Sequence, residues 1–143
     1  MKFLLVLALL VVIASLGISQ TEAYDGNIEA KVDAINKIEG DIIPVEIFLS
    51  NAEPDKEIPL EIMLIQKGTG AVVENITLNP SWIYDDMTFT GDRVWKTLYE
   101  FDTSSDTLEA KTTYYTKIVF DDKSDITGIF AFSPPVAEQT IQE

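Results

Sequence analysis

The 143-residue chain contains neither cysteine nor histidine. Without a thiol it can form no disulfide, carry no lipid-modified cysteine and use no cysteine nucleophile. Without an imidazole it can build no Ser-His-Asp triad, and no zinc or copper site of the imidazole or thiolate type. Catalysis would have to depend on carboxylates, lysine, tyrosine, serine or threonine. These absences favour a protein that binds or assembles over an enzyme, and we expect no cofactor.

Basic residues are scarce as well, with 10 Lys and Arg against 24 Asp and Glu and a formal net charge of −14. A surface of this charge repels nucleic-acid phosphates and anionic lipid headgroups, so neither is an expected partner. Solubility alone explains the excess of acidic residues. Cation binding, or docking onto a basic partner, is the functional alternative.

The first 23 residues have the pattern of a secretory signal. Lys2 gives a positive start, residues 3–14 are all apolar, and small and polar residues follow up to Ala23. The apolar stretch 3–18 covers 16 residues, fewer than the about 20 that a membrane-spanning helix needs. Cleavage of this signal helix after Ala23 is therefore favoured over an uncleaved membrane anchor. If the protein associates with a membrane at all, we expect it to do so only through this uncleaved segment. The sequence predicts a secreted or extracytoplasmic cell-surface protein.

The remainder of the chain has the size of one domain. Removing 23 of the 143 residues leaves 120, enough to bury a core without disulfides. The net charge stays at −14, because Lys2 and Glu22 are removed together. We assign residues 24–135 to a single β-sandwich domain and residues 136–143 to a polar C-terminal tail. The boundary follows Pro134 and Pro135, which cannot donate the hydrogen bonds of a strand.

Beyond the signal, apolar and polar residues alternate, which predicts an all-β fold without helices. The expected strands are seven: 27–35, 43–49, 58–66, 71–78, 94–101, 113–120 and 126–132. Residues 67–70 predict a tight hairpin turn and residues 121–125 a polar turn, whereas 79–92 is irregular. Seven short strands at this spacing favour an antiparallel sandwich over a barrel.

One segment resembles a known family. Leu108, Thr112 and Tyr114, followed by an alternating strand, resemble the tyrosine corner of fibronectin type III and related immunoglobulin-like domains. The resemblance implies a seven-stranded antiparallel immunoglobulin-like sandwich, in which the Tyr114 hydroxyl bonds to the backbone a few residues upstream. Tyr114 would then be structural. The chain departs from the family where Ala110 replaces a frequent proline and where the second strand lacks tryptophan. Such domains serve adhesion, scaffolding and ligand binding, so no single function is implied.

Acidic residues in two connections are candidate calcium ligands. One group is Asp102, Asp106 and Glu109, and the other is Asp121, Asp122 and Asp125. Each group could offer two or three oxygen ligands, whereas calcium takes six to eight. Carboxylates that only stabilise turns are favoured, because aspartate is common in turns. The second group remains the calcium candidate.

Aromatic residues supply the candidate contact site. Trp82 and Tyr84 lie in the irregular stretch, where exposed rings could contact a protein or stack on a glycan. Trp95, Tyr99 and Phe101 share one face of a predicted strand, and ordinary core positions are favoured for them.

Two further features concern the surface. Asn75-Ile76-Thr77 is an acceptor sequence for N-glycosylation on an exported protein. The first predicted strand, 27–35, could pair with a neighbouring subunit, although pairing inside its own sandwich is favoured.

Together these patterns predict a secreted or cell-surface, non-catalytic module that binds protein or glycan, or builds part of that surface. A calcium-stabilised adhesion or carbohydrate-binding module is the first alternative. A small hydrolase that uses two carboxylates is the second, and it would need a deep cleft between them.

Overall fold

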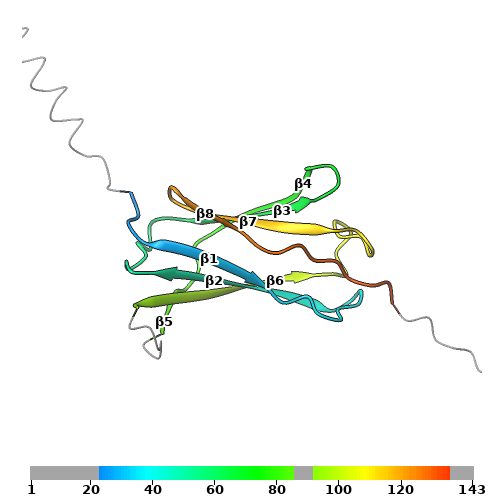
Figure 1. Ribbon diagram of the computed structural model, residues 1–143, viewed down its shortest axis with the longest axis horizontal. Coiled ribbons are helices and arrows are strands. Elements are labelled where there is room, and N and C mark those ends of the chain that lie inside the picture. The colour runs from blue at the N-terminus through cyan, green and yellow to red at the C-terminus, as the bar shows by residue number, and fades with distance from the viewer. Residues whose placement is uncertain (1–22, 86–91, 136–143) are drawn as a thin grey trace, which may run out of the picture.

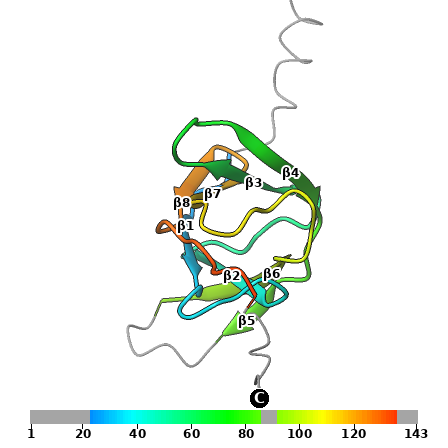
Figure 2. The same ribbon diagram turned by 90° about the vertical axis from the view of Figure 1, so that its right-hand side faces the viewer.

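The computed structural model describes residues 23–85 and 92–135, which form two antiparallel sheets of four strands each (Figure 1). The first sheet has the order β1-β2-β6-β5 and the second the order β4-β3-β7-β8. The strands are β1 (Asn27–Val32), β2 (Ile42–Ser50), β3 (Leu60–Gln66), β4 (Val72–Leu78), β5 (Ile83–Asp85), β6 (Val94–Asp102), β7 (Tyr114–Phe120) and β8 (Lys123–Ile126). Seen along the strands, the sheets are two stacked layers (Figure 2).

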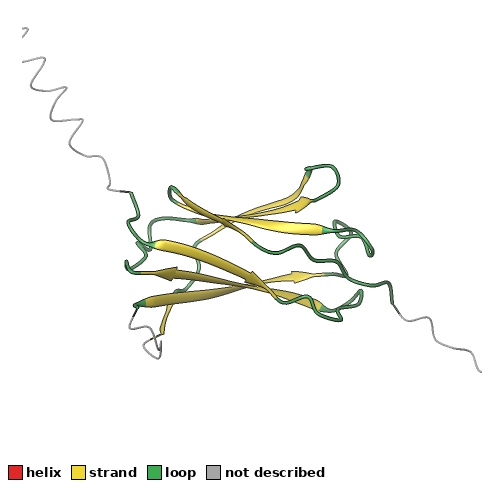
Figure 3. Cartoon of the chain, viewed as in Figure 1, coloured by secondary structure: helices red, strands yellow, loops and turns green. Residues whose placement is uncertain are grey.

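The described residues contain strands and loops but no helix (Figure 3), and thus no helix that could cross a membrane. The all-β prediction is confirmed, as is the division into two antiparallel sheets. The expected signal helix, except for its last residue Ala23, lies outside the described residues. The polar tail 136–143 lies outside them as well.

Residues 23–85 and 92–135 form eight strands instead of the predicted seven. The additional strand, β5, lies in the stretch 79–92 that alternation does not mark. It has only three residues, and it pairs with β6 at one edge of the first sheet. A strand this short offers too few positions for an alternating pattern to be recognised.

The last predicted strand, 126–132, is wrong in position. β8 begins at Lys123, because the turn after β7 has only two residues and Asp121 adopts a left-handed backbone with φ of 54°. The polar segment 123–125 therefore already pairs with β7. Residues 127–132 pass along β7 without forming a strand, with an isolated bridge between Phe130 and Tyr114.

Alternation places every second side chain on the inner face of its sheet. On β2 and β3, one inner strand of each sheet, these side chains are fully buried: Ile43, Val45, Ile47 and Leu49 on β2, and Leu60, Ile62 and Leu64 on β3. Ile118 and Phe120 on β7 complete the layer opposite β2. The core therefore consists of aliphatic and aromatic side chains from both sheets. The packing of these side chains holds the two sheets together without disulfides.

The aromatic residues of β6 face inward. Trp95 is 8% exposed and Phe101 is 1% exposed, and the ring of Tyr99 packs edge-on against Phe101 with centroids 4.9 Å apart. Burial raises the pKa of Tyr99, and the negative charge of Glu74 on β4 raises it further. Leu98 consequently points outward and is 53% exposed.

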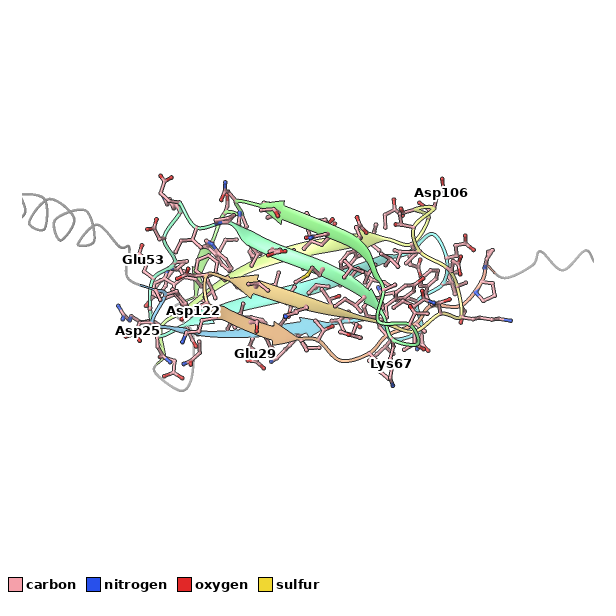
Figure 4. All side chains as sticks on the ribbon, turned by 90° about the horizontal axis from the view of Figure 1, so that it is seen from above. Asp25, Glu29, Glu53, Lys67, Asp106 and Asp122 are labelled. Carbon is pink, nitrogen blue, oxygen red and sulfur yellow. The ribbon has the colours of Figure 1, made fainter. Side chains whose placement is uncertain are left out.

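The two sheets meet along β1 and β8, which lie side by side (Figure 4). The backbone N–H of Ala30 on β1 donates a hydrogen bond of 2.8 Å to Oδ2 of Asp125 on β8. On its other side β1 pairs with β2 over its whole length. β1 is thus paired within its own sandwich.

Candidate functional site

The outer face of the first sheet carries exposed aliphatic side chains. Ile83 on β5 is 60% exposed and Leu98 on β6 is 53% exposed. Phe48 on β2 and Ile83 on β5 lie on either side of β6, because Lys96 on β6 pairs with both of them, and Leu98 is the next outward residue of β6. We call Phe48, Ile83 and Leu98 the outer patch. It exists because these three outward positions on adjacent strands are occupied by apolar residues where polar ones would be expected.

A shallow hollow of about 220 Å³ lies on this patch, lined by Glu46, Phe48, Ile83, Lys96, Thr97 and Leu98. Charged groups of both signs lie within it and around it, with Lys96 between Phe48 and Ile83. The Lys31 ammonium lies 5.5 Å from the centre of the Phe48 ring, and the Lys96 ammonium lies 3.9 Å from the Asp85 carboxylate. Apolar side chains mixed with charged groups occur at surfaces that bind another protein.

Trp82 and Tyr84, the predicted contact residues, have different surroundings. Trp82 is half-buried, and its ring meets that of Phe120 in the core edge-on, with centroids 5.7 Å apart. Tyr84 is 50% exposed and its ring tilts against Trp95, with centroids 5.0 Å apart. The two rings therefore contact different core residues, and Tyr84 is the more exposed of the pair.

A cavity of about 360 Å³ opens beside Trp82, lined by Glu53, Pro54, Lys56, Asn79, Pro80, Ser81, Trp82 and Trp95. Its volume falls in the range of small-ligand sites, about 300 to 1,000 Å³. Two indole rings and several hydrogen-bonding side chains are suited to a sugar ring. The segments 53–56 and 79–81 are polar and proline-containing, so that nothing in the sequence distinguishes them from ordinary loops.

The candidate calcium ligands bind backbone groups. Oδ2 of Asp121 accepts a hydrogen bond of 2.6 Å from the Tyr24 nitrogen, and Asp125 accepts the one from Ala30. Asp122 is exposed. Within residues 23–85 and 92–135, no three acidic side chains are grouped so as to hold a metal ion. Asp121, Asp122 and Asp125 are therefore not brought together around one point.

The other acidic group is also engaged locally. The hydroxyl and the backbone N–H of Ser104 both donate to Oδ1 of Asp102, at 2.6 Å and 2.9 Å. These hydrogen bonds, that of the hydroxyl first, hold the pKa of Asp102 below its usual value. The carboxylate thus stabilises the turn that follows β6.

The glycosylation sequence lies on the surface. Asn75 is exposed on β4, an edge strand of the second sheet, and Thr77 is exposed two positions further along the same face. A glycan attached at Asn75 would project from this edge without displacing core side chains.

No protein-family model matches the sequence, and no curated protein is significantly similar to it.

Proposed function

We propose that the protein is an exported, non-catalytic binding module that contacts a protein partner at the cell surface through the outer patch. The observation that carries this proposal is the exposure of Ile83 and Leu98 beside a hollow on the outer face of a sheet. Removing such side chains from water contributes roughly 25 cal/mol per Å² of apolar surface. Strands hold the patch in a fixed shape, which lowers the entropy cost of binding.

The chemistry of the patch favours a protein over a glycan as its partner. Its exposed members, Ile83 and Leu98, are aliphatic, whereas sugar rings stack on exposed aromatic faces. The formal net charge of −14 favours a partner with an apolar centre and basic groups around it. The lack of histidine and cysteine supports a function without catalysis.

We also infer that the sandwich is immunoglobulin-like. The order β1-β2-β6-β5 corresponds to strands A-B-E-D of that fold, and β4-β3-β7-β8 corresponds to C′-C-F-G. In this correspondence β7 is strand F, whose start carries Tyr114. The hydroxyl of Tyr114 accepts a hydrogen bond from the backbone N–H of Glu109, as a tyrosine corner requires. Adhesion and ligand binding are frequent functions of such domains, which is a fold-level analogy in favour of the proposal.

The test compares two matched variants of the chain that begins at Tyr24. Leu98→Glu places a charge on the outer patch, and Ile126→Glu places one on the outer face of the second sheet, where Ile126 is 56% exposed. Each protein is immobilised and incubated with cell-envelope and secreted proteins of its own cells. We expect a retained protein that is lost with Leu98→Glu and kept with Ile126→Glu.

The retained protein is then purified and titrated. Its affinity should fall by about tenfold or more with Leu98→Glu, which corresponds to about 1.4 kcal/mol. Retention of the same proteins by both variants would disprove the proposed surface. Turnover of a substrate by the purified chain would disprove the non-catalytic assignment.

The cavity beside Trp82 supports a second candidate function, the binding of a glycan. Both tryptophans of the chain line this cavity. A bound sugar should therefore change the intrinsic fluorescence, and Asn79→Ala should weaken the change while Asn75→Ala on β4 should not. An unchanged spectrum across a panel of cell-surface saccharides would eliminate this candidate.

A further inference from the structure

The first residue after the expected cleavage site is buried in the core. Tyr24 is 6% exposed, and its ring meets Phe120 edge-on with centroids 5.1 Å apart. Its hydroxyl donates a hydrogen bond of 2.8 Å to the carbonyl of Ala52. Gly26 permits this arrangement, because a Cβ there would collide with the Tyr24 ring. Chain termini are usually poorly ordered unless contacts hold them in place. The contacts of Tyr24 would hold the start of the mature chain on the core.

The backbone nitrogen of Tyr24 is 2.6 Å from Oδ2 of Asp121 in the turn between β7 and β8. In an uncleaved chain this nitrogen is a peptide N–H, and the hydrogen bond is that of a neutral donor to a carboxylate. In a chain that begins at Tyr24 the same nitrogen is an α-amino group, which is protonated below about pH 8. The same geometry would then join two opposite charges.

We propose that the leader is removed between Ala23 and Tyr24, and that the new α-ammonium group of Tyr24 pairs with the Asp121 carboxylate and locks the mature N-terminus onto the β7–β8 turn. The inference depends on the proposed export of the chain. In the cleavage, water attacks the Ala23 carbonyl, the peptide bond breaks, and the Ala23 carboxylate and the Tyr24 amine are released. The amine then takes up a proton. A peptidase of the export machinery is the catalyst.

The identity of residue 121 supports the pairing. A two-residue hairpin turn with a left-handed first residue accepts glycine or asparagine as well as aspartate. Asp121 has φ of 54°, so a neutral residue would serve the turn equally well. The carboxylate adds a negative charge at the position that faces the Tyr24 nitrogen. Asp25 and Asp122 lie at the same end of the sandwich (Figure 4), so the ammonium group also reduces repulsion among carboxylates there.

The pairing is tested with two versions of the chain, one that starts at Tyr24 and one that starts at Ala23. The core residues lie between Tyr24 and Phe132, so both versions contain the whole core. In the longer version the Tyr24 nitrogen is a peptide N–H and the ammonium group moves one residue away. Each version is made with and without Asp121→Asn, which keeps the tolerance for a left-handed backbone and an oxygen acceptor but removes the charge.

We expect Asp121→Asn to raise the unfolding equilibrium constant in both versions. The factor by which it rises should be about ten times larger in the chain that starts at Tyr24 than in the chain that starts at Ala23. Asp122→Asn, the matched control, should have the same effect in both. Equal effects of Asp121→Asn in the two versions would overturn the ion pair.

The cleavage position is tested by expressing the full 143-residue chain in a secreting host and measuring the intact mass of the secreted protein. We expect the mass of residues 24–143. A secreted protein cut at another bond would overturn this inference and leave the export proposal intact. A chain that is never exported would overturn the export proposal itself.

Discussion

The hydroxyl of Tyr114 accepts a hydrogen bond of 2.8 Å from the backbone N–H of Glu109, five residues upstream. Tyr114 is 2% exposed, and its own backbone N–H and carbonyl both bond to Phe130. Leu108, next to Glu109, is buried in the core. One residue thus joins the β6–β7 connection, the start of β7 and the segment after β8.

Replacing Tyr114 with Phe should destabilise the domain, because it leaves the Glu109 N–H without its partner while the ring stays in place. The loss should be about 1 to 3 kcal/mol in the free energy of unfolding, measured by urea denaturation. Tyr115→Phe is the control, since Tyr115 lies on the outer face of the same strand. Equal losses for the two variants would contradict a structural role for the Tyr114 hydroxyl.

Phe120 is in contact with two aromatic rings from distant parts of the chain, those of Tyr24 and Trp82. Phe120→Ala should cost about 3 to 5 kcal/mol of stability and shift the tryptophan emission to longer wavelength, because a cavity opens beside Trp82. Val119→Ala, one position along β7 on the outer face, should leave the emission unchanged. An unchanged spectrum for Phe120→Ala would mean that Trp82 does not pack on the core in solution.

Stability should fall in alkaline solution. Burial raises the pKa of Tyr24 to about 12 from the ordinary value of 10.0. The neutral phenol is therefore favoured in the folded state, and its contribution is complete below about pH 10 and lost as the pH rises to about 12. Urea midpoints measured across this interval should decrease, and they should decrease less steeply for Tyr24→Phe. The same slope in both proteins would show that Tyr24 ionises freely when folded.

Asp125 should protect the edge of β1. Asp125→Ala removes the acceptor of the Ala30 N–H and should cost about 1 to 2 kcal/mol. Amide hydrogen exchange at Ala30 should become faster, as NMR would show residue by residue. Asp122→Ala removes a carboxylate from the same hairpin and should leave that amide as it was.

Alternation in the sequence predicts the buried faces of the long strands. Ile47 and Ile62 are typical, since most core-facing strand positions are apolar whatever the topology, although Thr116 on β7 is a fully buried exception. β8 escapes such a prediction because its residues 123–126 lie at a sheet edge, where polar side chains are tolerated. Only the backbone of Asp121 reveals that the turn ends so early.

The outer patch could not be predicted, for a different reason. On β6 both faces carry large apolar side chains, so the sequence favours burial of Trp95 over burial of Leu98 but does not decide between them. Packing decides in favour of the aromatic face, and Leu98 is left outside. Phe48 and Ile83 join it only because β2, β6 and β5 are neighbours, a relationship between segments far apart in the chain.

The bond between Asp125 and Ala30 has a consequence for behaviour in concentrated solution. β proteins polymerise at exposed strand edges, because the unpaired N–H and C=O groups there can form hydrogen bonds with a strand of another molecule. At β1, the carboxylate of Asp125 already occupies such an amide, and Glu29 and Lys31 flank it with charge. A strand added at this edge would find the Ala30 amide already bonded and would gain fewer ladder bonds. We therefore expect this edge of the domain to resist fibre growth at high protein density.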